Sequence, residues 1–164
     1  MIDPEKGRWL AEIIARYKPT LGSWYCDTGN CIPQTEQIYL ALNHAQPGWW
    51  RMVWAQRLEP TVQIQGKPVR IINGHQFLVK ADTAGTPEEV IVDPTIRQFF
   101  SAIGGRRIPG IFVGTRIELI ELFRRNSQSL RVQPIGENAP TRGADPDELV
   151  DIFYGLSHGR EEPR

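Results

Sequence analysis

The feature that most constrains the fold is a change of pattern at Thr61, where helical spacing gives way to short β-rich runs. Before Thr61, apolar residues recur at helical spacing over about residues 4–17, over a segment from Ile32 to Leu42, and over residues 47–57. After it come four runs separated by turn residues: Thr61–Gln65, Val69–Ile72, Gln76–Lys80 and Val90–Val92. Helices followed by an antiparallel sheet predict an α+β domain.

The rest of the chain adds shorter elements to this domain. The pattern predicts a short helix near Thr95–Ile103, a strand over Ile111–Val113, a helix over Arg116–Arg125 and a last short helix over Asp147–Leu156. Thr115 is the expected N-cap of the helix over Arg116–Arg125, with Glu118 at the capping-box position. We expect residues 1–164 to form a single domain, with residues 157–164 as a flexible tail.

Length and charge bear on which partners are expected. A chain of 164 residues can bury about two-thirds of the surface that it exposes when unfolded, so its core needs no disulfide or metal ion for stability. Its 19 Lys and Arg residues balance 19 Asp and Glu residues, so we expect neither nucleic acid nor an acidic membrane surface as a partner. The N-terminus lacks the basic region followed by an apolar run that a Sec signal peptide has. The chain also has no apolar segment long enough to span a bilayer.

The two cysteines, Cys26 and Cys31, pose three alternatives: a disulfide, part of a metal site, or one reactive thiol. Two cysteines in a chain of this length favour a reducing compartment or a catalytic thiol. No second Cys/His cluster stands at ligand spacing, so we expect no metal and no cofactor. A reversible Cys26–Cys31 bond would block the thiol under oxidising conditions and release it in a reducing cytosol.

Cys31 is the better candidate for a nucleophile because it falls in the first turn of a predicted helix, where backbone N–H groups favour a thiolate. A thiolate needs a base and an acid to orient that base. His75 opens one predicted strand and Asp93 closes another. If these strands pair antiparallel through the loop at residues 82–87, imidazole and carboxylate meet on one rim of the sheet.

The alternative interpretation is structural. A buried cysteine at a helix start, a hydrogen-bonded histidine at a strand start and a capping aspartate would all fit a non-catalytic protein-binding module. The other two histidines are weaker candidates, because His44 lies at a predicted helix C-terminus and His158 lies in the tail.

Three segments together resemble the papain-like fold toxin and effector domains, many of which are glutamine deamidases. They are Thr28-Gly29-Asn30-Cys31, Gly74-His75-Gln76-Phe77-Leu78-Val79, and Val90-Ile91-Val92-Asp93-Pro94-Thr95 with Gln98-Phe99. The resemblance covers about residues 22–100. It implies a papain-like fold in which a helix bearing the nucleophile packs on an antiparallel sheet, with further helices toward the C-terminus. It also implies Cys31 as nucleophile, His75 as general base and acid, and Asp93 as the orienting carboxylate.

The same resemblance implies a thiol hydrolase that deamidates glutamine in a protein substrate, with a papain-like cysteine protease or a transglutaminase-like enzyme as alternatives. Papain-type peptidases carry a glutamine six residues before the nucleophile, where this chain has Tyr25, and this departure weighs against general proteolysis. Asn30, Tyr25 or a backbone amide are then the candidate oxyanion donors. The implied partners are a cognate immunity protein or a larger carrier toxin. The implied site of action is a reducing cytosol, that of a target cell reached by specialised secretion.

Overall fold

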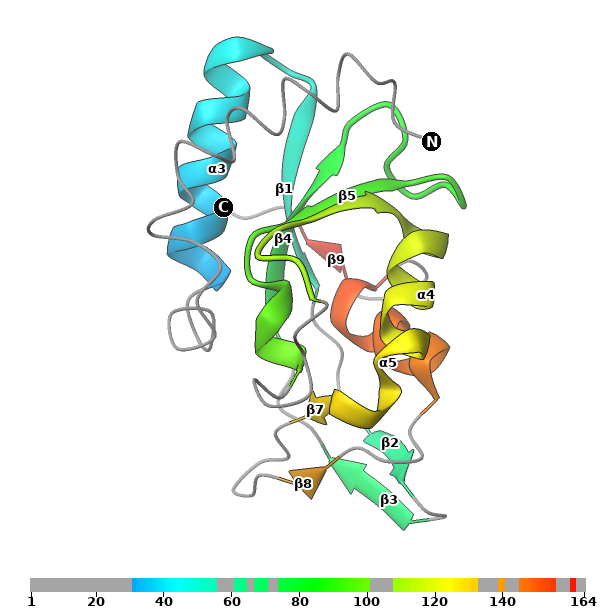
Figure 1. The fold of residues 1–164 in the computed structure, drawn as a ribbon. Helices are drawn as coiled ribbons and strands as arrows, with labels where there is room; N and C mark the ends of the chain where they lie inside the picture. The colour runs from blue at the N-terminus through cyan, green and yellow to red at the C-terminus, as the bar shows by residue number, and fades with distance from the viewer. Residues whose placement is uncertain are drawn as a thin grey trace.

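The computed structural model describes residues 31–55, 61–64, 67–70, 74–100, 108–132, 139–140, 145–155 and 160–161. Over these ranges the chain is an α+β protein, as predicted (Figure 1). The predicted helix over residues 4–17 lies outside the described residues, and so do the three site candidates Tyr25, Cys26 and Asn30. The helices are α3 (Cys31–Ala45), α4 (Arg116–Arg125) and α5 (Pro146–Tyr154), with 3-10 turns η1 (Ile96–Phe99) and η2 (Ser127–Ser129).

The main sheet of the described residues has five strands in the order β6-β5-β4-β1-β9, with every neighbouring pair antiparallel. Its members are β1 (Trp50–Ala55), β4 (His75–Lys80), β5 (Val90–Asp93), β6 (Phe112–Thr115) and β9 (Arg160–Glu161). The predicted antiparallel pairing of β4 with β5 is confirmed. Strand β9 falls within the segment expected to be a tail, where it pairs with Trp54 and Ala55 of β1.

The predicted helix over residues 47–57 is wrong, because Trp50–Ala55 is strand β1. The chain turns at Gly48, whose φ of 80° suits glycine, and then pairs with β4 along all six residues of β1. Val53 and Ala55 point to one core cluster and Trp50 to the other, which is the period-two pattern of a strand buried on both faces. Pairing with β4 overrides the helical spacing of the tryptophans.

Several other predicted elements are found with shifted bounds, but the helix predicted near Thr95–Ile103 is a 3-10 turn over Ile96–Phe99 in the described residues. Strands β2 (Thr61–Ile64) and β3 (Lys67–Arg70) form a two-stranded sheet of their own instead of joining the main one. Strands β7 (Arg131–Val132) and β8 (Ala139–Pro140), which were not predicted, form a second small sheet. The helix over Arg116–Arg125 is found as predicted, and Thr115 with Glu118 makes the expected capping box.

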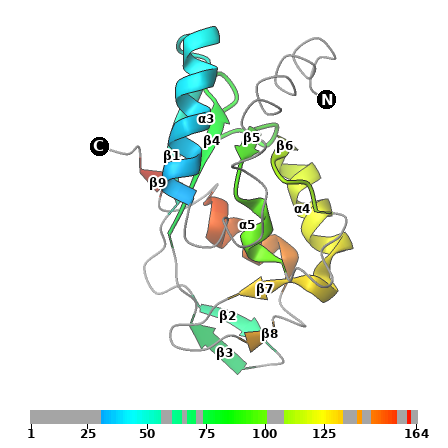
Figure 2. The ribbon, with the colours of Figure 1, turned by 60° about the vertical axis from the view of Figure 1, so that its left-hand side comes forward.

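Helices cover both faces of the main sheet (Figures 1 and 2). Helix α3 packs on β1 and β4, where Ile38 and Leu42 meet Leu78 and Val92. Helices α4 and α5 pack on the opposite face, over a larger core that is centred on the aromatic residues of η1, β4 and α5. The start of β4 therefore lies between two helical layers.

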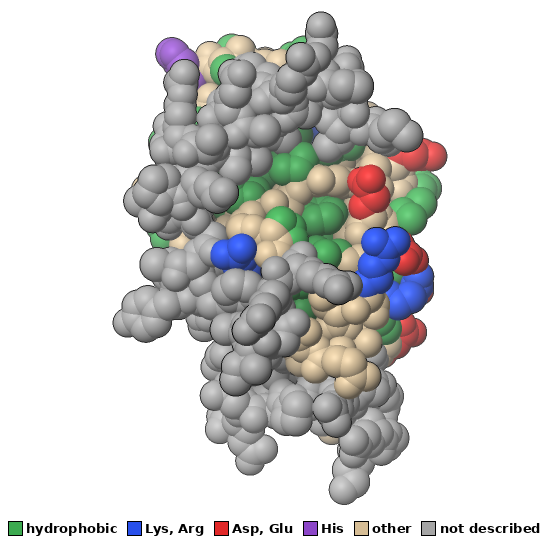
Figure 3. Space-filling view, viewed as in Figure 1, with side chains coloured by type: hydrophobic (Ala, Val, Ile, Leu, Met, Phe, Trp, Pro, Cys, Tyr) green, Lys and Arg blue, Asp and Glu red, His purple; other side chains and the backbone are tan. Residues whose placement is uncertain are grey.

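Charged side chains gather over α4 on the face that Figure 3 shows. Arg124 there contacts both Glu121 and Asp147 in exposed ion pairs, which contribute little to stability. These charges are a solvated helix face and do not indicate a site. Among the residues that the structure describes, no helix has the length and apolar character needed to cross a membrane.

Candidate active site

The start of β4 and the end of β5 bring His75 and Asp93 together. The strands pair at Leu78–Val92 and Val79–Ile91, so the first residues of β4 lie beside the last residues of β5. His75 Nε2 is 2.8 Å from Asp93 Oδ2, and both side chains are almost completely buried. Gly74, which precedes the histidine, has a φ of 151°, and a Cβ there would lie 2.5 Å from the Trp54 ring. Only glycine fits at this entry to the strand.

The carboxylate of Asp93 accepts four hydrogen bonds. Its Oδ1 accepts from the backbone N–H of Thr95 at 2.8 Å and from the Thr95 hydroxyl at 3.1 Å. Its Oδ2 accepts from His75 and from the Tyr154 hydroxyl, which lies 2.5 Å away. Helix α5 ends at Tyr154 because Gly155 adopts the left-handed conformation of a C-cap. The charge of Asp93 is thus held by three different elements.

Cys31 reaches the same group from α3. The His75 ring and the backbone N–H of Gln76 lie near enough to its thiol to lower the pKa of that thiol. One turn further along α3, the Thr35 hydroxyl donates to the carbonyl oxygen of Gln76 at 3.0 Å. Strand β5 pairs with β4 only from Leu78 onward. Beside Gln76, the neighbour of β4 is therefore helix α3 and not β5. Helix α3 therefore contacts both backbone groups of Gln76, and this fixes the thiol beside the imidazole.

The electrostatics of the cluster favour ionised partners. Burial would raise the pKa of the Cys31 thiol, but His75 and the Gln76 N–H outweigh burial and hold this pKa below its ordinary value. Burial would lower the pKa of His75, yet Asp93 and Cys31 raise it to about 9. Burial acts against ionisation of Asp93 as well, but His75, Tyr154 and Thr95 lower its pKa. These three pKa shifts favour a thiolate–imidazolium pair that is held in position by a carboxylate.

Aromatic side chains surround the imidazole of His75. The ring centroids of Phe99 and Tyr154 lie 4.9 and 5.2 Å away in edge-on contacts, and Phe77 is stacked at 5.7 Å. This wall keeps water from the far side of the ring, so the hydrogen bond to Asp93 acts in a medium of low dielectric constant, where it is strong. The ring is therefore fixed in position and orientation.

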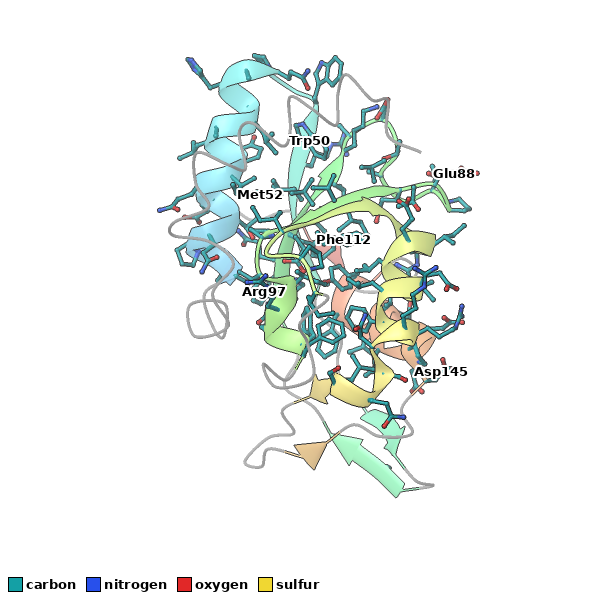
Figure 4. All side chains as sticks on the ribbon, in the orientation of Figure 1. Trp50, Met52, Glu88, Arg97, Phe112 and Asp145 are labelled. Carbon is teal, nitrogen blue, oxygen red and sulfur yellow. The ribbon has the colours of Figure 1, made fainter. Side chains whose placement is uncertain are left out.

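Further polar contacts reach His75 from η1, which follows β5 directly and carries Arg97, labelled in Figure 4. The Gln98 carboxamide Nε2 lies 3.2 Å from His75 Nδ1 and 2.9 Å from Thr95 Oγ1. Arg97 donates to the carbonyl oxygen of Ile108 through Nε and Nη2. The amide of Gln98 is thus the polar group of η1 that contacts the imidazole.

The structure brings together Cys31, His75 and Asp93 as the sequence predicted. His44 lies exposed in the last turn of α3, and His158 is outside the described residues. Thr35 and Tyr154 were not among the predicted site residues. Thr35 could have been found from its position one helical turn after Cys31, on the buried face of α3.

The hydrogen bond from Thr35 leads to a stability prediction. Replacing Thr35 with valine keeps the shape of the side chain but leaves the buried carbonyl of Gln76 without this donor, so we expect the free energy of unfolding to fall by about 1–3 kcal/mol. Thr35→Ser, which keeps the hydroxyl, is the matched control and should lose less. Urea denaturation of both variants measures the difference, and equal losses would show that the hydroxyl contributes nothing.

The fold and the site together define an α+β domain with a buried Cys–His–Asp cluster at one rim of its sheet. Comparison of the chain with protein-family models, with curated proteins and with solved structures finds no match. The chemistry of the site must therefore be inferred from its own residues.

Proposed function

We propose that the protein is a cysteine-dependent acyl-transfer enzyme in which Cys31 is the nucleophile, His75 the general base and acid, and Asp93 the residue that orients the imidazole. The observation that carries this proposal is the continuous contact from Cys31 through His75 to Asp93, whose Oδ2 lies 2.8 Å from His75 Nε2. Because Nε2 faces Asp93, the ring nitrogen left for the thiol is Nδ1. A thiol, an imidazole and an orienting carboxylate in this order are the parts that covalent acyl transfer requires.

The reaction we propose is deamidation of a glutamine side chain in a protein. The Cys31 thiolate attacks the carboxamide carbon, and His75 protonates the nitrogen as the C–N bond breaks and ammonia leaves. Water then gives a proton to His75 and attacks the thioester, which releases glutamate and restores the thiol. A nucleophile on a helix that packs on an antiparallel sheet, with histidine and aspartate on adjacent strands, also supports the papain-like fold that the sequence resemblance implies.

The choice of deamidation over its alternatives is tested with candidate target proteins. We expect ammonia release and an equal number of glutamines converted to glutamate, measured by an enzymatic ammonia assay and by mass spectrometry of the target. Neither product should form with Cys31→Ala. New peptide termini would show a protease instead, and incorporation of an added primary amine would show a transglutaminase-like reaction. Activity that persists in Cys31→Ala would reject the proposed nucleophile.

One observation favours a second candidate, a non-catalytic module that binds a protein partner. The side chain of Cys31 is only 8% exposed, and His75 and Asp93 are 1% and 0% exposed. A substrate carbonyl must reach the sulfur, so a thiol that stays covered would serve packing alone. Reaction of Cys31 with a small alkylating reagent in the native protein separates the two candidates, because only an enzyme needs the thiol to be reachable.

A further inference from the structure

The Gln98 carboxamide contacts both His75 and Thr95, the residue that binds the Asp93 carboxylate. Its Nε2 lies 2.9 Å from Thr95 Oγ1 and 3.2 Å from His75 Nδ1, the nitrogen that the thiol needs as its proton acceptor. Gln98 comes from η1, whereas the thiol comes from α3. The amide is therefore placed to affect the imidazole independently of Cys31.

The direction of the hydrogen bonds fixes which end of the amide faces the ring. Asp93 has a depressed pKa, and an ionised carboxylate only accepts hydrogen bonds. The one hydroxyl proton of Thr95 is directed to Asp93 Oδ1, so Thr95 Oγ1 must accept from Gln98. The amide nitrogen then stands at Thr95, and its second N–H points to His75 Nδ1. A reversed amide would set two acceptor oxygens against each other at Thr95.

We infer that Gln98 is a positioning residue whose amide N–H opposes protonation of His75 at Nδ1, against the imidazolium that Asp93 and Cys31 favour. In the neutral ring, Nε2–H donates to Asp93 and the lone pair of Nδ1 accepts from Gln98. When the Cys31 thiol passes its proton to Nδ1, the S–H bond breaks and an N–H bond forms, and the Gln98 N–H then faces another N–H and must turn away. Gln98 thus opposes the imidazolium that Asp93 and the thiolate favour.

Within the part of the chain that the structure describes, the polar groups that face His75 come from four neighbouring elements. Helix α3 presents Cys31, β5 presents Asp93, and α5 presents the Tyr154 hydroxyl, whose pKa is raised by burial and by Asp93 so that it stays protonated. The segment η1 presents Gln98, while Arg97 is directed to Ile108. Gln98 is therefore the neutral donor in this group that acts on Nδ1.

Two variants test the inference through the titration of His75, followed by NMR of protein labelled with 15N in histidine. Gln98→Met keeps the length of the side chain and removes the N–H, so we expect the protonation equilibrium of His75 to shift about tenfold toward the imidazolium at a given pH. Gln98→Glu replaces the donor with a charged acceptor for Nδ1–H and should shift it further. Arg97→Met, on the same turn, is the control and should leave the titration midpoint of His75 unchanged.

A titration midpoint of His75 that rises in both Gln98 variants and not in the control supports the inference. A midpoint that stays unchanged in folded Gln98→Met and Gln98→Glu overturns it, and so does a neutral form that carries its proton on Nδ1 in the unsubstituted protein. The inference rests on the proposed function only in treating Cys31 as the proton donor. Because the titration is read without substrate, its failure leaves the proposed activity standing, and loss of ammonia release alone leaves the role of Gln98 standing.

Discussion

Replacing Asp93 with asparagine is expected to lower the free energy of unfolding by about 3–5 kcal/mol, as removal of one partner from a buried charge pair does. All four contacts of the Asp93 side chain come from donors, on Thr95, His75 and Tyr154. Asparagine has a single acceptor oxygen, so in either orientation its NH2 group faces donors that the carboxylate satisfied. Urea unfolding followed by circular dichroism measures the loss.

The control for this prediction is Asp82→Asn, which removes an exposed carboxylate paired with Lys80 and should cost no more than about 1 kcal/mol. The contribution of Asp93 to the free energy of unfolding also depends on pH. Its pKa is lower in the folded protein than its unfolded value of about 3.9, so its contribution is present above that pH and is lost as the pH falls through the folded pKa. Equal stabilities of the two variants at neutral pH would contradict the proposed anchoring by Asp93.

Replacing His75 with glutamine is expected to lower kcat by about 10²–10⁴, the usual contribution of a general acid and base. Glutamine still offers an N–H to Asp93 but cannot exchange a proton with the thiol. Without the imidazolium, burial dominates and the pKa of Cys31 should rise. Ammonia release measures the first effect, and the pH dependence of Cys31 alkylation measures the second.

His44→Gln is the matched control, because His44 is exposed at the far end of α3 and should leave both quantities unchanged. Stability gives a further check. The pKa of His75 is raised from about 6.5 to about 9, so its stabilising contribution is complete below about pH 6.5 and is lost as the pH rises toward 9. This slope should be absent in His75→Gln. A variant that keeps the activity and the thiol pKa of the unsubstituted protein would exclude His75 as the base.

The approach of His75 to Asp93 could be predicted because it depends on short-range topology. His75 and Asp93 flank one hairpin, and antiparallel pairing alone brings the start of β4 beside the end of β5. The capping box of Thr115 with Glu118 is equally local, which explains why α4 begins at the predicted residue.

Contacts between segments that are distant in the chain could not be predicted from the sequence in the same way. Tyr154 is 61 residues from Asp93, and only the packing of α5 on β4 brings its hydroxyl to the carboxylate. Strand β1 was missed because the spacing of Trp50, Val53 and Trp54 fits a helix, whereas its pairing with β4 depends on a partner 20–30 residues away. The separation of β2 and β3 from the main sheet likewise depends on tertiary packing that β propensity does not encode.

The most direct test of the proposed nucleophile is the rate of alkylation of Cys31 by iodoacetamide as a function of pH, with the modified site identified by peptide mapping so that Cys26 is counted separately. We expect Cys31 to react well below pH 8.5, the ordinary pKa of a thiol, and we expect this reactivity at low pH to be lost in His75→Gln. A Cys31 that reacts only at or above pH 8.5, or only after the protein unfolds, would contradict the assignment of this site as catalytic.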